Sequence, residues 1–110
     1  MKKKILFICS QNRLRSPTAE QVYAKREDLL VSSAGLNNDA TNRVSGELLE
    51  WADIIFVMEK SHLNRLRKKF RKHLKGQRLI CLDIPDIYEY MEPALIEVFE
   101  SKLPRYVGFP

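Results

Sequence analysis

The 110-residue sequence contains little of what would mark a disulfide-stapled, membrane-embedded or repetitive protein. Its two cysteines each end or lie within a short apolar run, so they do not form a disulfide framework. None of its apolar runs is long enough to cross a bilayer, and it has no internal repeat and no low-complexity linker. Residues 1–110 are therefore expected to form a single domain around one core.

Acidic residues are absent from one long segment of the chain. Residues 60–78 hold nine Lys or Arg and no Asp or Glu, whereas residues 79–102 hold six acids and one Lys. A charge run is usually a solvated face, and we expect the two segments to balance each other across neighbouring helices. The net charge of +5 favours anionic partners without identifying them.

The basic segment also has a functional interpretation. A surface that includes Lys68 and Lys69 would recruit nucleic acid or a phosphorylated polyanion. We favour this interpretation less, because no aromatic ladder accompanies the charges. The two histidines, His62 and His73, lie in the same segment and are expected to be solvated rather than to bind a metal ion.

The N-terminal residues do not have the pattern of a signal peptide. Lys2 to Lys4 precede an apolar run that is too short for one, and polar residues 11–15 follow it. We expect this run to be the first strand of a cytoplasmic protein with no membrane partner.

Short apolar runs alternate with segments of helical periodicity along the chain. Because strands that alternate with helices form parallel sheets with right-handed crossovers, this order predicts a three-layer α/β/α domain with a four-stranded parallel sheet. Residues 103–110 are expected to be a tail of uncertain order. The predicted strands cover residues 4–8, 29–32, 54–58 and 78–82, and the predicted helices cover residues 17–26, 46–51, 60–75 and a segment that begins at Pro93.

The nine residues from Cys9 to Pro17, CSQNRLRSP, connect the first predicted strand to the first predicted helix. Backbone N–H groups in such a turn lack intrahelical acceptors, and the helix dipole favours negative charge at the same place. Arg15 adds a planar fork that matches two oxygens of a phosphate. The same field stabilises a thiolate, which makes Cys9 a candidate nucleophile. The predicted phosphate-binding residues are Ser10, Gln11, Asn12, Arg13, Leu14, Arg15 and Ser16.

The context of this turn separates it from a chance pairing of a cysteine with an arginine. Ser16 is a good N-cap and Pro17 suits the first helical position, so a helix is predicted to start directly after the turn. Cys81, by comparison, is followed six positions later by Ile87, with no arginine and no cap. The alternative for Cys9 is the commoner fate of a cysteine buried in a strand.

Four segments resemble, in the same order, segments of the low-molecular-weight protein tyrosine phosphatases. Cys9–Glu20, CSQNRLRSPTAE, is similar to the phosphate-binding loop of that family. Val31–Gly35 is similar to its S-A-G strand end, Ala52–Glu59 to its central strand and Ile84–Tyr88 to its Asp-Pro-Tyr acid loop. The resemblance extends to about Phe99. It implies the fold of that family and hydrolysis of phosphomonoesters through a phosphocysteine intermediate, with no metal or other cofactor.

The resemblance also implies a role for each matching residue of the loop. Cys9 is the nucleophile, and the guanidinium of Arg15 holds the phosphate. Ser16 donates its hydroxyl to the thiolate as well as capping the helix. Asn12 braces the loop through side-chain hydrogen bonds, although its position also suits a turn residue that tolerates positive φ.

Asp86 matches the general acid of the family, which protonates the leaving group and then serves as base for the attacking water. Two departures from the family pattern lie beside it, since Ile87 replaces a proline and Glu89 stands where an aromatic residue is expected. Asp83 is a second candidate for the acid. Tyr88 is expected to line the pocket.

Three further departures from the family concern the substrate. Gln11 and Arg13 stand where members carry glycine and an apolar residue, and a cation at the pocket mouth suits a phosphorylated substrate with a second anionic group. The segment 35–52 is shorter than in typical members, which alters one wall of the pocket. Leu14 occupies the position of the second loop cysteine of some members, so a protective disulfide within the loop is not possible.

Two other functions are compatible with the same residues. If the acid loop no longer supports catalysis, the chain is a phosphate- or nucleic-acid-binding module on the same fold. Arsenate reduction is a third possibility, since arsenate mimics phosphate in related proteins that have this fold. That reaction needs resolving cysteines, and only Cys81 remains, predicted inside a strand.

Overall fold

The structure is a computed structural model and describes residues 2–108. Its strands are β1 (Lys3–Cys9), β2 (Leu29–Gly35), β3 (Ile54–Val57) and β4 (Arg78–Cys81). They form one sheet in the order β2-β1-β3-β4, and every neighbouring pair is parallel. This confirms the predicted four-stranded parallel sheet.

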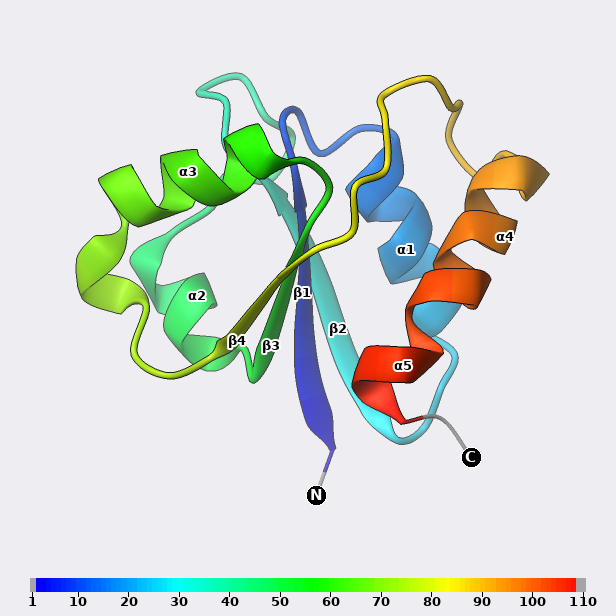
Figure 1. Cartoon of the computed structure of the whole chain (residues 1–110), viewed down its shortest axis with the longest axis horizontal. Coiled ribbons are helices and arrows are strands. Elements are labelled where there is room, and N and C mark those ends of the chain that lie inside the picture. The colour runs from blue at the N-terminus through cyan, green and yellow to red at the C-terminus, as the bar shows by residue number, and fades with distance from the viewer. Residues whose placement is uncertain (1, 109–110) are drawn as a thin grey trace.

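Helices cover both faces of that sheet. They are α1 (Arg15–Tyr23), α2 (Gly46–Trp51), α3 (Lys60–Lys69), α4 (Pro93–Lys102) and α5 (Pro104–Val107), with a 3-10 turn, η1 (Arg71–His73), after α3. Figure 1 shows α1, α4 and α5 on one face and α2 and α3 on the other, which confirms the three predicted layers. Within residues 2–108, no helix has the length and apolar character that crossing a membrane requires.

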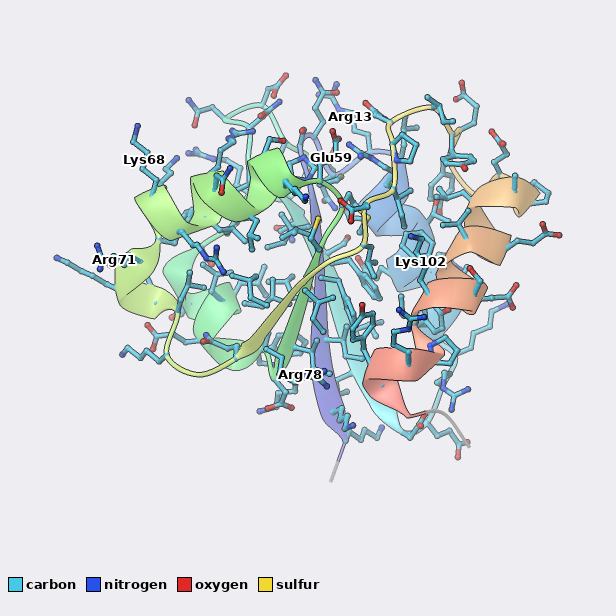
Figure 2. All side chains as sticks on the ribbon, in the orientation of Figure 1. Arg13, Glu59, Lys68, Arg71, Arg78 and Lys102 are labelled. Atoms are coloured by element: carbon cyan, nitrogen blue, oxygen red, sulfur yellow. The ribbon has the colours of Figure 1, made fainter. Side chains whose placement is uncertain are left out.

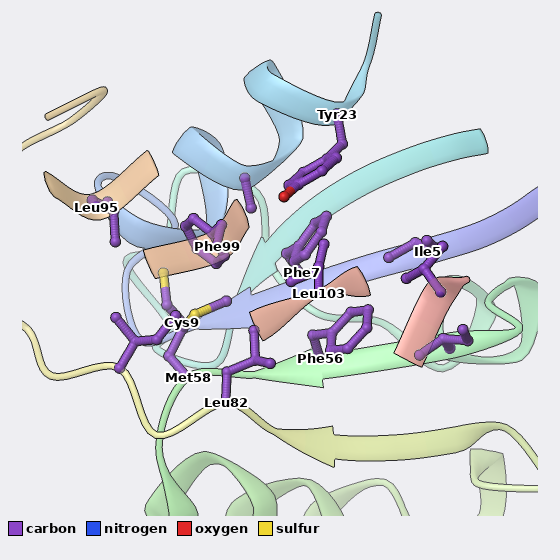
Figure 3. Close-up of a cluster of buried hydrophobic side chains, with 14 of the residues drawn as sticks. Ile5, Phe7, Cys9, Tyr23, Phe56, Met58, Leu82, Leu95, Phe99 and Leu103 are labelled. Atoms are coloured by element: carbon purple, nitrogen blue, oxygen red, sulfur yellow. The ribbon is translucent and has the colours of Figure 1, made fainter. Parts of the chain in front are cut away.

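The central strand β1 is buried on both faces, which is why its sequence reads as an unbroken apolar run. Phe7 and Cys9 belong to the core on the side of α1 and α4, whereas Leu6 belongs to the core on the side of α2 and α3. In the first of these cores (Figure 3), Phe7 stacks on Phe56 with centroids 5.5 Å apart and meets Phe99 edge-on at 6.0 Å. This packing fixes the carboxyl end of β1, where Cys9 lies.

The helix predicted over 60–75 is shorter in the structure, because α3 ends at Lys69. The chain has to reverse direction before β4, and it does so through η1 and Gly76, whose φ of 113° suits glycine. The side chain of Gln77 stabilises the reversal by donating to the carbonyls of Leu49 and His73 at 2.7 and 2.8 Å.

The segment 103–110, expected to be a tail of uncertain order, is folded as far as residue 108. Leu103 and Val107 are buried in the core on the side of α1 and α4. Lys3 also donates from its ammonium to the carbonyl of Val107 at 3.2 Å. Residues 109–110 lie outside the described residues.

The two charged segments do not form neighbouring helices that balance each other, so that prediction is wrong. The basic helix α3 packs on β3 and β4 from one side, whereas α4, which carries Glu97 and Glu100, packs on α1 from the other side (Figure 1). The four-stranded sheet lies between them. The acids of α4 are therefore separated from the exposed cations of α3.

Gly35, at the end of β2, lies directly against the loop that follows β1. A Cβ atom at this position would be 2.6 Å from the Cβ of Ala40, 2.7 Å from the carbonyl oxygen of Ser10 and 2.9 Å from the nitrogen of Asn12. The next backbone N–H donates to the last carbonyl of β1 at 3.0 Å. Glycine is thus required for the close approach of β2 to this loop.

Replacement of Gly35 by alanine should displace the loop, because two of the three close contacts are backbone atoms that cannot rotate away. We expect Gly35→Ala to lower the free energy of unfolding by about 1–3 kcal/mol. We also expect it to weaken the binding of inorganic phosphate. Denaturant unfolding and isothermal titration calorimetry measure the two effects.

The matched control is Gly35→Ala/Ala40→Gly, which removes the contact between the two Cβ atoms and leaves the backbone contacts. It should not restore phosphate binding. Full restoration would show that Gly35 does not constrain the loop backbone.

Candidate functional site

A cavity of about 160 Å³ opens at the carboxyl end of β1, inside the loop that leads to α1. The carboxyl ends of parallel strands are the usual place for ligands in open α/β sheets. Six of its seven lining residues come from the predicted loop, and Asp86 comes from the segment after β4. The lining residues are Cys9, Ser10, Gln11, Arg13, Leu14, Arg15 and Asp86.

Cys9 lines this cavity although the residue is only 3% exposed. The Ser16 hydroxyl oxygen lies 2.9 Å from the sulfur, and the backbone N–H of Asn12 donates to it at 3.2 Å. Both groups are able to donate to a sulfur anion, and hydrogen bonds of this kind favour the thiolate as nucleophile. The geometry therefore suits a nucleophilic thiolate.

The Ser16 hydroxyl belongs to a network of side chains behind the sulfur. Ser33 donates its hydroxyl proton to the Glu20 carboxylate and accepts from the amide of Asn12 at 2.9 Å. The same amide donates to Ser16, also at 2.9 Å. The one hydroxyl proton of Ser16 has two acceptors nearby, the Cys9 sulfur at 2.9 Å and a main-chain carbonyl at 3.5 Å. Because a thiolate can only accept, Ser16 would donate to the sulfur once Cys9 is ionised.

Asn12 both shapes the turn and braces it. Its backbone is left-handed, with φ of 56°, a conformation that asparagine tolerates better than most residues. Its side chain is buried and donates hydrogen bonds to Ser16 and Ser33. Asn12 therefore both braces the loop and occupies a turn position of positive φ, so the two interpretations of the sequence hold together.

Ser16 is not the N-cap that its position predicts. α1 begins at Arg15 with Leu14 as N-cap, because the backbone N–H and the hydroxyl of Thr18 both bond the Leu14 carbonyl, at 3.1 and 2.6 Å. Ser16 thus lies inside the first turn of the helix, where its hydroxyl reaches Cys9.

The Arg15 guanidinium is almost fully buried beside the cavity. Its Nη1 donates to the Glu59 carboxylate at 2.6 Å and to the Ile84 carbonyl at 2.7 Å. Its Nε lies 3.7 Å from a carboxylate oxygen of Asp86. Since these two bonds use both protons of Nη1, the edge formed by Nε and Nη2 is the one that can hold two phosphate oxygens.

His62 is only 1% exposed, so the prediction that it is solvated is wrong. Its Nδ1 accepts from the backbone N–H of Glu59 at 3.1 Å, and its Nε2 lies 2.9 Å from the Ser10 hydroxyl. A neutral imidazole that accepts at Nδ1 carries its proton on Nε2, so His62 donates to Ser10. Burial, and then the charge of Arg15, lower the pKa of His62 to about 4.

Glu59 and His62 are not among the site residues that the sequence predicts. A signal for them exists, because they follow the strand at 54–58 directly and are three positions apart. That spacing places both side chains in one helical turn, at the same edge of the sheet as Cys9. His73, the other histidine, lies at the surface beside the Glu50 carboxylate.

Asp86 and Asp83 line different cavities. The Asp86 side chain is 61% exposed and lines the cavity of Cys9 and Arg15. Asp83 lines a separate cavity and accepts a hydrogen bond from the Cys81 thiol at 3.4 Å. Of the two candidates, the position of Asp86 suits the general acid better.

The mouth of the Cys9 cavity is polar. Arg13 is exposed there, and its guanidinium donates to the side chain of Gln11 at 3.3 Å and to the carbonyl of Asp39 at 3.2 Å. Figure 2 shows Arg13 and Glu59 at the same end of the molecule. Tyr88, predicted to line the pocket, is not among its lining residues and instead packs, partly buried, against the core.

Cys81 lies at the end of β4, in the strand where it was predicted. It pairs with Val57, which in turn pairs with Ile8, the neighbour of Cys9. Two strand spacings amount to about 10 Å, whereas a disulfide needs Cα atoms within about 7 Å. Burial also raises the pKa of the Cys81 thiol. This position argues against a resolving cysteine and so against arsenate reduction.

Comparisons with known proteins find similarity in structure and none in sequence. No protein-family model matches the chain, and no curated protein matches it. Among solved structures, it is similar to the tyrosine phosphatase Wzb from Escherichia coli K30 in complex with phosphate. The two share 21% identity over 96% of both chains, with a TM-score of 0.75.

Two further structures show the same similarity. One is SP-PTP, a low molecular weight protein tyrosine phosphatase from Streptococcus pyogenes, with 15% identity over 96% of this chain and 93% of that chain and a TM-score of 0.76. The other is the YwlE arginine phosphatase from Geobacillus stearothermophilus, with 21% identity over 90% and 82% and a TM-score of 0.62. The chain therefore has the fold of the low-molecular-weight protein tyrosine phosphatases, which confirms the fold that the resemblance implies.

The buried, neutral state of His62 should make the stability of the fold depend on pH. Its pKa is 6.5 in an ordinary setting and about 4 in the fold, so between these values the unfolded chain binds more protons than the folded chain. The contribution of the neutral His62 to the free energy of unfolding should be complete above about pH 6.5. It should be lost as the pH falls toward about 4, by up to about 3 kcal/mol. Denaturant unfolding at several pH values measures this slope.

The control for this prediction is His62→Asn, which keeps an acceptor near the position of Nδ1 and removes the titrating ring. Its free energy of unfolding should fall less steeply over the same pH range. Parallel pH profiles for the two proteins would mean that His62 is not the source of the dependence.

Proposed function

We propose that this chain is a member of the low-molecular-weight protein tyrosine phosphatase family and hydrolyses phosphomonoesters, with Cys9 as nucleophile, Arg15 as phosphate clamp and Asp86 as general acid and base. The main support is the Cys9 sulfur, which lies near two hydrogen-bond donors and shares a cavity with the other two residues. The similar solved structures are phosphatases, which supports hydrolysis of a phosphorylated substrate as the reaction class.

In the first step, the Cys9 thiolate attacks phosphorus in line with the leaving oxygen. The S–P bond forms while the P–O bond breaks, and Asp86 donates its proton to the departing oxygen. The Nε and Nη2 groups of Arg15 and the N–H groups of the loop hold the other phosphate oxygens, where negative charge is concentrated.

In the second step, water attacks the phosphorus of the phosphocysteine. Asp86, now a carboxylate, takes a proton from the water as the S–P bond breaks, and inorganic phosphate leaves. Cys9 departs as a thiolate, and the hydroxyl of Ser16 stabilises that charge. Ser16 therefore contributes both to the formation of the nucleophile and to its release.

Ser10 and His62 complete the proposed phosphate site. Ser10 lines the cavity and accepts a hydrogen bond from Nε2 of His62. The hydroxyl proton of Ser10 is then free to be donated to a phosphate oxygen. His62 acts through Ser10 and is thus a positioning residue.

The proposed chemistry also restricts the cellular compartment in which the protein can work. A thiolate nucleophile is lost on oxidation unless a second cysteine protects it by forming a disulfide. This chain has Leu14 where some members of the family have that cysteine, and Cys81 is too distant. We therefore place the protein in a reducing compartment, the cytoplasm.

Hydrolysis of para-nitrophenyl phosphate by three variants tests the assignment. We expect Cys9→Ser to lower kcat by at least about 1,000-fold, because it removes the nucleophile. Asp86→Asn should lower it by about 100-fold, because it removes the proton donor. Asp83→Asn is the matched control and should leave the rate nearly unchanged.

The outcomes separate the alternatives. A larger loss in Asp83→Asn than in Asp86→Asn would transfer the acid role to Asp83. Binding of phosphate or orthovanadate by a wild type that shows no turnover would mean that the loop is a recognition site, as in the binding-module alternative.

The role of His62 is tested by two substitutions that separate its two hydrogen bonds. His62→Asn retains the acceptor for Glu59 but cannot reach Ser10, whereas His62→Gln places an amide donor near Nε2. We expect His62→Asn to weaken competitive inhibition by inorganic phosphate by about tenfold, the equivalent of one hydrogen bond. His62→Gln should retain most of this inhibition.

A double-mutant cycle with Ser10→Ala shows whether His62 acts through Ser10. In the Ser10→Ala background, His62→Asn should have little further effect on inhibition by phosphate. Equal losses in His62→Asn and His62→Gln, with additive effects of Ser10→Ala, would point to a general structural role for the ring instead.

A further inference from the structure

A second hollow lies between the loop that follows β2 and the exposed side of α3. It has a volume of about 410 Å³ and is lined by Leu36, Arg65, Lys68 and Lys69. Leu36 and the aliphatic stems of the three basic side chains provide an apolar floor, while their charged ends lie at the rim. We call this hollow the α3 groove.

The cations of the α3 groove are not neutralised by the protein itself. Arg65, Lys68 and Lys69 are exposed, and in the part of the chain that the structure describes no carboxylate oxygen lies within 4.0 Å of their charged nitrogens. Figure 2 shows Lys68 extending from α3 on the side of the molecule opposite Lys102 of α4. The groove therefore presents a positive rim toward solvent.

The α3 groove is a near neighbour of the Cys9 cavity. Leu36 donates from its backbone N–H to the carbonyl of Cys9 at 3.0 Å, and His62, in the first turn of α3, contacts Ser10. From His62, residues 65 and 69 lie about 5 and 10 Å farther along the helix axis. An extended polypeptide covers that distance with about two to four residues.

We propose that the α3 groove binds an acidic segment of a phosphorylated polypeptide, two to four residues away from the phosphorylated residue that enters the Cys9 cavity. The proposal rests on the proposed function and names the substrate class. Carboxylates of the substrate pair with the rim, and one apolar side chain lies on the floor. Arg13, at the mouth of the cavity, adds a further cation close to the phosphorylated residue.

The shape of the groove favours an acidic peptide over a nucleic acid. Single-stranded nucleic acids are held by exposed aromatic side chains that stack on the bases. The aromatic residue next to these cations is Phe70, which is partly buried against the core, and the ammonium of Lys69 lies 5.7 Å from its ring centroid. A small apolar floor with a positively charged rim suits an apolar side chain of a peptide that has carboxylates on its neighbouring residues.

The test uses pairs of synthetic phosphotyrosyl peptides that carry either glutamates or glutamines two to four residues from the phosphotyrosine. One pair has this segment before the phosphotyrosine and the other pair has it after. In one of the two pairs, the wild type should have a kcat/KM about tenfold higher for the glutamate peptide than for the glutamine peptide. Lys68→Glu/Lys69→Glu should abolish this preference. Hydrolysis of para-nitrophenyl phosphate should not change, because that substrate does not reach the groove.

The matched control is Lys25→Glu/Arg105→Glu, which makes the same change in net charge at two exposed residues away from the groove, one in the turn after α1 and one in α5. It should leave the preference intact. Loss of the preference in this control as well would show that net charge, not the α3 groove, is responsible, and absence of any preference in the wild type would overturn the proposal.

Binding measured separately distinguishes failure of this proposal from failure of the proposed function. Fluorescence anisotropy with the unphosphorylated acidic peptide should show binding that Lys68→Glu/Lys69→Glu removes, whether or not the wild type turns over any substrate. Salt-dependent binding of a DNA or RNA oligonucleotide that is lost in this variant, with no binding of the peptide, would overturn the proposal in favour of a nucleic acid.

Discussion

The side-chain amide of Asn12 joins α1 to β2, because it donates to Ser16 and to Ser33, while the backbone N–H of the same residue points at the Cys9 sulfur. An amide nitrogen can only donate, so both serines accept from it, and Ser33 gives its own proton to Glu20. Both amide protons of Asn12 are therefore used, and its side chain is held between α1 and β2. The network leaves the backbone N–H of Asn12 and the hydroxyl of Ser16 beside the Cys9 sulfur.

The first turn of α3, together with the residue before it, supports the same loop from the opposite side. Glu59 binds the guanidinium of Arg15, and His62 donates to Ser10. A buried guanidinium needs an anionic partner, and Glu59 supplies it without occupying the edge that faces the cavity. The neutral ring of His62 provides a donor without adding a charge next to Arg15. Because α3 also lines the groove, the residues that hold the loop and the residues of the basic rim lie on α3 or, for Glu59, directly before it.

Much of the fold and part of the site could be predicted from local patterns. The four strands follow from apolar runs of strand length, and the loop after β1 follows from Cys9, Arg15 and the helix that comes next. These patterns work because a strand buried on both faces excludes polar residues along its whole length. Local patterns failed for Ser16, which makes a good N-cap in isolation, and for His62, whose charged neighbours in the sequence suggest a solvated helix.

The sequence by itself determined the order of strands and helices along the chain, the position of the loop between β1 and α1 and the net charge of α3. Only the tertiary structure decided that His62 is buried against the loop after β1 while Lys68 is exposed, that the acids of α4 lie across the sheet from α3, and that Asp86 rather than Asp83 borders the Cys9 cavity. The physical reason is that burial and the direction of hydrogen bonds depend on atoms from β1, β2, α1 and α3. These elements are distant along the chain and meet only when the parallel sheet brings their ends to one edge.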